Sequence, residues 1–199
     1  MTLLHALDLL STFVFALVGA RIAADRGLDY GGIAFVATIA SISGGTLRNV
    51  FLGILPVWIT DPWILASVLA AVIITLTLRR VTHVGKVLLI LDTFALAMAT
   101  LSGTQLAYEI GIPWYSCIVL GVITAVTGGL LRDVLCQVPP VLLHRETIGT
   151  SALMGAATYV VFNSVGATDL ISVIGGAIVV IATRVISIQF DLHLPKFQK

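Results

Sequence analysis

Two arginines lie inside apolar stretches of this 199-residue chain, and each follows a pair of glycines. Residues 44–56 read GGTLRNVFLGILP, and residues 128–140 read GGLLRDVLCQVPP. A charged side chain and a helix-weakening glycine pair are both costly inside a bilayer unless they face a cavity or a protein partner. The pattern therefore points to a polar pathway through a membrane, with Arg48 and Arg132 beside it.

The two segments belong to a longer internal repeat. Residues 8–56 align without a gap to residues 92–140, at an offset of 84 and with 12 identities in 49 positions. Repeats of this kind occur in many transporters and some channels, which place their binding site near the bilayer midplane, between the repeats.

Each copy of the repeat also carries an aspartate at about the depth of its arginine. A carboxylate is the usual partner that makes an intramembrane arginine tolerable. We therefore predict that Asp8 pairs with Arg48 and that Asp92 pairs with Arg132. The alternative is that these pairs only hold helices together and have no part in a pathway. Asp133 stands where the first copy has Asn49, so the two halves are not electrically equivalent.

The composition is that of a polytopic membrane protein. Hydrophobic residues make up 58% of the chain and charged residues 11%, whereas soluble proteins carry about 25% charged residues. Several apolar runs approach the roughly 20 residues that cross a bilayer as a helix. There is no nucleophile, phosphate loop, metal-ligand spacing or basic arm. We therefore expect no enzyme activity, no cofactor, no bound metal centre and no nucleic-acid partner.

The apolar runs predict an all-α polytopic membrane protein with seven transmembrane helices in a single domain, residues 1–199. Residues 1–83 form the first repeat, residues 84–167 the second, and a seventh helix (168–190) stands alone. A three-span repeat reverses its direction when it recurs, so the architecture is an inverted three-plus-three repeat plus one helix. The predicted spans are 3–22, 31–55, 62–79, 87–107, 113–138, 147–166 and 169–189.

The placement of the basic residues predicts the orientation. Eight of the 11 Lys and Arg residues flank or lie in the first, third and fifth connections or the C-terminal tail, and none falls on the opposite side. By the positive-inside rule, the N-terminus lies outside and the C-terminus is cytoplasmic, in the inner membrane. Trp58, Trp63 and Trp114 fall at span ends on the other side, as an interfacial belt would.

The glycine pairs predict breaks in the second and fifth helices. Each glycine weakens a helix by about 1 kcal/mol, and a break frees carbonyls near residues 41–44 and 125–128 that could coordinate a cation. The alternative is that the glycines allow close helix packing. With nearby hydroxyls and charges, the predicted ion pathway comprises Ser41, Ser43, Gly44, Gly45, Thr46, Arg48, Thr124, Thr127, Gly128, Gly129, Arg132 and Asp133.

The sequence resembles the prokaryotic members of the trimeric intracellular cation channel (TRIC) family. The resemblance rests on the GGTLRN and GGLLRD segments, the repeat and the extra seventh span, and it covers essentially the whole chain. It implies a homotrimer with one pore in each subunit, lined by kinked second and fifth helices, that passes monovalent cations such as potassium. The alternative is a transporter of a small amino acid such as glycine. A bare arginine repels cations but binds a carboxylate, which favours that alternative.

Overall fold

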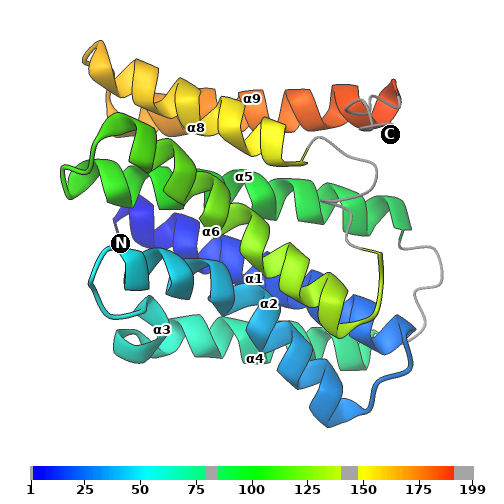
Figure 1. Cartoon of the computed structure of the whole chain (residues 1–199). Helices are drawn as coiled ribbons and strands as arrows, with labels where there is room; N and C mark the ends of the chain where they lie inside the picture. The colour runs from blue at the N-terminus through cyan, green and yellow to red at the C-terminus, as the bar shows by residue number, and fades with distance from the viewer. Residues whose placement is uncertain (1, 79–84, 140–147, 191–199) are drawn as a thin grey trace, which may run out of the picture.

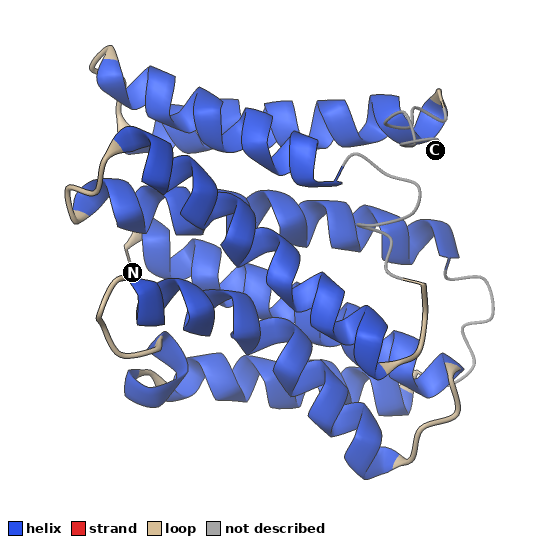
Figure 2. Cartoon of the chain, in the orientation of Figure 1, coloured by secondary structure: helices blue, strands red, loops and turns tan. Residues whose placement is uncertain are grey.

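The computed structural model describes residues 2–78, 85–139 and 148–190, and within these residues all regular secondary structure is helical (Figures 1 and 2). Five of the basic residues used for the orientation lie outside the described residues, namely Arg79, Arg80, Arg145, Lys196 and Lys199. The helices are α1 (Leu3–Asp25), α2 (Tyr30–Phe51), α3 (Val57–Thr60), α4 (Pro62–Thr77), α5 (Gly85–Glu109), α6 (Trp114–Leu135), α8 (Ile148–Ser164) and α9 (Asp169–Gln189).

The predicted class, an all-α membrane protein, is confirmed. Five of the described helices, α1, α2, α5, α6 and α9, are long and apolar enough to cross a membrane. α4 is apolar but has only 16 residues, and α8 has 17. Each of the seven predicted spans overlaps one of these helices, but the number of membrane crossings stays a prediction.

Two helices end three or four residues earlier than the sequence predicted. α2 ends at Phe51 and not near residue 55, and α6 ends at Leu135 and not near residue 138. In each case the second residue after the helix has a positive φ, 69° for Gly53 and 52° for Gln137. A residue in this left-handed conformation turns the chain and terminates the helix. After α2 the chain continues into the short helix α3, which the sequence did not predict.

The helices pack as two related groups. In the first group α1 contacts α2 and α4, and in the second group α5 contacts α6 and α8. The two groups meet where α1 contacts α5 and where α2 contacts α6. Successive long helices run in alternating directions, so the first turn of α1 and the last turn of α9 lie at opposite ends of the bundle (Figure 1). The repeated segments with the two arginines are therefore neighbours, on α2 and α6.

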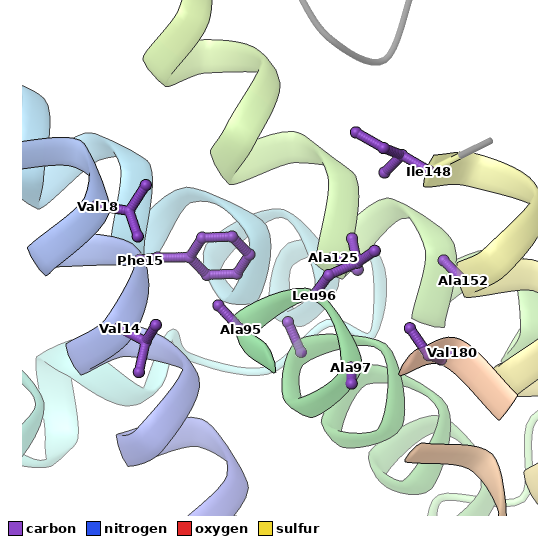
Figure 3. Close-up of a cluster of buried hydrophobic side chains, with 11 residues drawn as sticks. Val14, Phe15, Val18, Ala95, Leu96, Ala97, Ala125, Ile148, Ala152 and Val180 are labelled. Atoms are coloured by element: carbon purple, nitrogen blue, oxygen red, sulfur yellow. The ribbon is translucent and has the colours of Figure 1, made fainter. Parts of the chain in front are cut away.

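A buried apolar cluster joins α1 to α5 and α6. Phe15 of α1 is only 5% exposed, and its ring points toward Ala95 and Leu96 of α5 and toward Ala125 of α6 (Figure 3). Large apolar side chains are also exposed on the outer faces of the bundle, as expected where lipid and not water surrounds a protein. The core thus connects the two repeats beside the polar residues that the sequence singled out.

Candidate functional site

Arg48 is fully buried, at 0% exposure, and lies at the centre of a polar network. Its Nη1 and Nη2 donate to the two carboxylate oxygens of Asp8 at 3.0 and 3.2 Å, and its Nε donates to Oδ1 of Asn49 at 2.8 Å. Nη1 also donates to Oγ of Ser102 at 2.6 Å, and the Ser102 hydroxyl donates to Asp8. Most N–H groups of Arg48 therefore already have an acceptor, and a bidentate carboxylate neutralises its charge.

Arg132 occupies the equivalent position in α6 but has different partners. Its Nη1 donates to Oδ1 of Asp92 at 2.6 Å, and its Nε and Nη2 donate to Oδ1 of Asp133 at 2.9 and 2.8 Å. The structure thus brings both predicted acid–arginine pairs together. It adds a second carboxylate to the Arg132 pair.

A cavity of about 40 Å³ lies beside Arg48, and we call it the Arg48 cavity. It is large enough for one or a few water molecules, because one water needs about 10–15 Å³ measured in this way. Eight of the residues singled out from the sequence line it, namely Asp8, Ser41, Gly44, Gly45, Thr46, Arg48, Thr124 and Gly128.

A second cavity, of about 20 Å³, lies beside Arg132, and we call it the Arg132 cavity. The predicted residues Gly129, Arg132 and Asp133 line it together with Asp92. Ser43 and Thr127 are not among the described residues that line either cavity. The structure therefore divides the predicted pathway residues between two small sites on neighbouring helices.

The predicted helix breaks are wrong. α2 and α6 are continuous α-helices through both glycine pairs, although α2 changes direction about halfway along its length (Figure 1). A Cβ atom on Gly44 would lie 2.0 Å from the carbonyl oxygen of Thr124, and one on Gly128 would lie 2.2 Å from that of Ala40. Both distances are far below contact, so only glycine allows the two helices to approach this closely. For Gly44 and Gly128 the structure supports the packing alternative.

The second glycine of each pair has a different environment. A Cβ atom on Gly45 would lie 3.9 Å from Nη2 of Arg48, and one on Gly129 would lie 3.8 Å from Nη2 of Arg132. These are ordinary contact distances. Gly45 and Gly129 therefore leave space next to the guanidinium groups, and no close contact with a described residue of another helix requires them.

Four of the five hydroxyl groups that line the Arg48 cavity share one hydrogen-bonding pattern. Ser11, Ser41, Thr46 and Thr124 each donate to a carbonyl three or four residues earlier in their own helix, at 2.6–3.1 Å. A carbonyl only accepts, so each of these hydroxyl hydrogens is directed at its helix and lone pairs remain for the cavity, with one lone pair of Thr46 already accepting from Trp58. These four hydroxyl groups thus present acceptors to the cavity.

Several residues at the Arg48 cavity were missed or misassigned by sequence reasoning. Trp58 on α3 lines the cavity and donates through Nε1 to Oγ1 of Thr46 at 3.0 Å, whereas the sequence placed it in an interfacial belt. Ser11 and Thr12 were missed, although their spacing of three and four residues after Asp8 puts them on the same helix face. Ser102, which bonds Arg48 but is not among the residues that line the cavity, gave no signal, because the other copy has a valine at the equivalent position, Val18.

Comparison with known proteins identifies relatives over the whole chain. A family model described as "Glycine transporter" matches twice, over residues 5–80 and 89–164, which is the same offset of 84 as the internal repeat. The UPF0126 inner membrane protein YadS of Escherichia coli strain K12 is 30% identical over 202 residues, covering 98% of this chain and 96% of that protein.

Solved structures show the same fold. The TRIC trimeric intracellular cation channel orthologue from Rhodobacter sphaeroides has a TM-score of 0.90 and 28% identity, covering 96% of this chain and 100% of that chain. A second TRIC cation channel structure has a TM-score of 0.87 and 27% identity, covering 100% and 98%. Both repeats match the family model, so the chain belongs to the family that this model describes as "Glycine transporter", and the whole fold identifies it with the prokaryotic TRIC channels.

Proposed function

We propose that this protein is a homotrimeric channel of the inner membrane that passes monovalent cations such as potassium, with one pathway in each subunit between α2 and α6. The observation that carries the proposal is the acceptor wall of the Arg48 cavity. Oxygen lone pairs from Ser11, Ser41, Thr46 and Thr124 can replace part of the hydration shell of a cation. A carboxylate would meet the same lone pairs and be repelled.

The hydrogen bonds of Arg48 also favour a cation over an amino acid as the transported species. A bare arginine would repel a cation, but Arg48 is neutralised by Asp8 through a bidentate contact. An amino-acid transporter would need free N–H donors for the substrate carboxylate, and those of Arg48 are mostly engaged by Asp8, Asn49 and Ser102. The network therefore removes the electrostatic objection to a cation and weakens the case for an amino acid.

The inverted arrangement and the trimer are part of the proposal. α1, α2 and α4 correspond to α5, α6 and α8 at the offset of 84, and the alternation of helix directions makes equivalent helices antiparallel (Figure 1). The likeness to the trimeric Rhodobacter sphaeroides orthologue extends over 96% of this chain, which supports the same assembly.

The test compares ion flux with substrate uptake in liposomes that contain the purified protein. We expect potassium flux that follows the imposed gradient and does not saturate at low concentration, and we expect no saturable glycine uptake. Saturable glycine uptake without potassium flux would establish the second candidate, a glycine transporter, which the family description favours.

Two threonines on α6 provide a matched pair for this assay. Thr124 and Thr127 both donate to the carbonyl four residues earlier at 2.6 Å, but only Thr124 is among the described residues that line the Arg48 cavity. Thr124→Val removes an oxygen from the cavity wall without changing its shape, so we expect potassium flux to fall about fivefold. Thr127→Val should leave the flux unchanged. Equal flux in both variants would remove the Arg48 cavity from the pathway.

A further inference from the structure

The two cavities are copies of one another. Ten described residues line the Arg132 cavity, and eight of them lie 84 positions after a residue that lines the Arg48 cavity. These eight are Asp92, Leu96, Ala125, Val126, Gly129, Leu130, Arg132 and Ile148. The comparison of the two cavities is therefore position by position.

The copies differ in polarity at three positions. Thr12, Ser41 and Thr46 of the Arg48 cavity correspond to Leu96, Ala125 and Leu130 of the Arg132 cavity. Every one of these changes replaces a hydroxyl with an apolar side chain. Outside its charged groups, the described wall of the Arg132 cavity therefore lacks the side-chain oxygen atoms that could replace the water around a cation.

Phe15 links the two cavities. It is the one residue that appears in the described lining of both, and its ring points toward Leu96 and Ala125 (Figure 3). Its equivalent in the second repeat is Ala99, which lines only the Arg48 cavity among the described residues. A single bulky ring thus lies where the two repeats meet, next to the leucines that replace the threonines.

We infer that Phe15, Leu96 and Leu130 form an apolar gate that closes the pathway on the Arg132 side by excluding water. This inference rests on the proposed channel function. The Arg132 cavity, at about 20 Å³, has room for about one water molecule. The carboxylates of Asp92 and Asp133 already bond Arg132, and the other described residues of the wall offer no side-chain oxygen to an ion that gives up its hydration shell there. Apolar constrictions block conduction by dewetting. The Arg48 cavity, in contrast, is the hydrated part of the path.

The test transfers the residues of one cavity into the other. Leu96→Thr and Leu130→Thr place in the Arg132 cavity the residue types that the Arg48 cavity has at the same positions. We expect each to raise potassium flux in liposomes about tenfold, since it replaces apolar surface with an oxygen ligand. Leu130→Met, which stays apolar at similar volume, should not raise the flux. Ile90→Thr and Val119→Thr, at exposed positions of α5 and α6, are controls for polarity alone.

Ala125→Ser is the variant to use if the leucine variants do not assemble, because it adds the hydroxyl of Ser41 with little extra volume. If the wild-type protein passes potassium and none of Leu96→Thr, Leu130→Thr and Ala125→Ser increases this flux, the gate is overturned but the channel function stands. Absence of potassium flux from every variant, together with glycine uptake, overturns both. Increased flux confined to the three cavity variants supports the gate, whereas an equal increase in the exposed controls overturns it.

Discussion

The two buried arginines have different surroundings, although they occupy equivalent positions. Arg48 contacts one carboxylate, one amide and one hydroxyl, from three helices. Arg132 contacts two carboxylates, and one of them belongs to the next residue of its own helix. The Arg48 network therefore ties α1, α2 and α5 together, whereas Asp133 neutralises Arg132 locally. Loss of Asp8 should leave Arg48 without any charged partner that the structure describes.

The first prediction concerns the Asp8–Arg48 pair. Arg48→Ala leaves the partly buried Asp8 carboxylate without its charged partner and should lower the free energy of unfolding, by at most the roughly 3–5 kcal/mol found for fully buried pairs. The double variant with Asp8→Ala should recover part of this loss, because no uncompensated charge remains. Denaturant unfolding in detergent micelles measures all the variants. The control is the double variant with Arg48→Ala and Asp92→Ala. These two residues do not contact each other, so their effects on the unfolding free energy should add. If the effects of Arg48→Ala and Asp8→Ala also add, the ion pair contributes no coupling energy.

The second prediction concerns Ser102, which bonds both members of that pair. Ser102→Ala removes a hydrogen bond from Arg48 and one from Asp8, so we expect a loss of about 1–3 kcal/mol in unfolding free energy. Ser67 on α4 is the matched control, since its hydroxyl bonds only the carbonyl of Ile64 in its own helix. Ser67→Ala should change stability by less than about 0.5 kcal/mol. Equal effects of the two substitutions would mean that Ser102 is not part of a functional network.

The sequence predicts the ion pairs of the two arginines but not their other partners, for a physical reason. The Asp8–Arg48 and Asp92–Arg132 pairs could be predicted, because depth in the membrane limits the possible partners of a buried charge. Ser102 could not be predicted, because contact between α1, α2 and α5 depends on packing that no spacing within one helix encodes. The wall hydroxyls were only partly found, since Ser11 and Thr12 belong to a helix that the glycine motif does not mark.

At the scale of the element, the contact between α2 and α6 decides the role of the glycines. The sequence shows that Gly44 and Gly128 are equivalent, but a glycine pair is compatible both with a helix break and with close packing. The structure distinguishes these uses within each pair. The first glycine meets a backbone carbonyl of the opposite helix, and the second faces an arginine.

The third prediction follows from this division. Gly44→Ala places a Cβ atom 2.0 Å from a backbone carbonyl oxygen, so the helices must separate. We expect a loss of about 1–3 kcal/mol in unfolding free energy from this overpacking. Gly45→Ala meets nothing closer than 3.9 Å and should be neutral or stabilising by up to about 1 kcal/mol, since alanine favours the helix.

The same contrast applies to the second repeat, where Gly128→Ala should destabilise the protein and Gly129→Ala should not. Unfolding in detergent micelles measures the four variants side by side. If the second glycine of each pair proves as sensitive as the first, the close approach of α2 and α6 is not what requires the glycines.

At the scale of the whole molecule, the sequence predicted the helical class and the approximate place of every long helix. It did so because apolar length is a direct requirement of the bilayer. It misplaced the ends of α2 and α6, where Gly53 and Gln137 turn the chain, because a left-handed residue is a local backbone choice that hydropathy does not report. It also missed α3, which is too short to have a periodic pattern and instead covers the Arg48 cavity with Trp58.

The last prediction concerns the orientation of the molecule in the membrane. Eight of 11 Lys and Arg residues lie in, or next to, the connections and the C-terminal tail that the helix order assigns to one side, and none falls on the other. The connection between α1 and α2 and the last turn of α9 lie at the same end of the bundle, and the connection between α5 and α6 lies at the opposite end (Figure 1).

A periplasm-active reporter fused after Lys199 should therefore be silent, and one fused near Gly111 should be active. A cytoplasm-active reporter at the same two sites should give the reverse pattern, which controls for expression. The opposite result with both reporters would place the Arg48 cavity toward the cytoplasm, and ions leaving the cell would then meet its hydroxyl wall before the apolar side chains around Arg132.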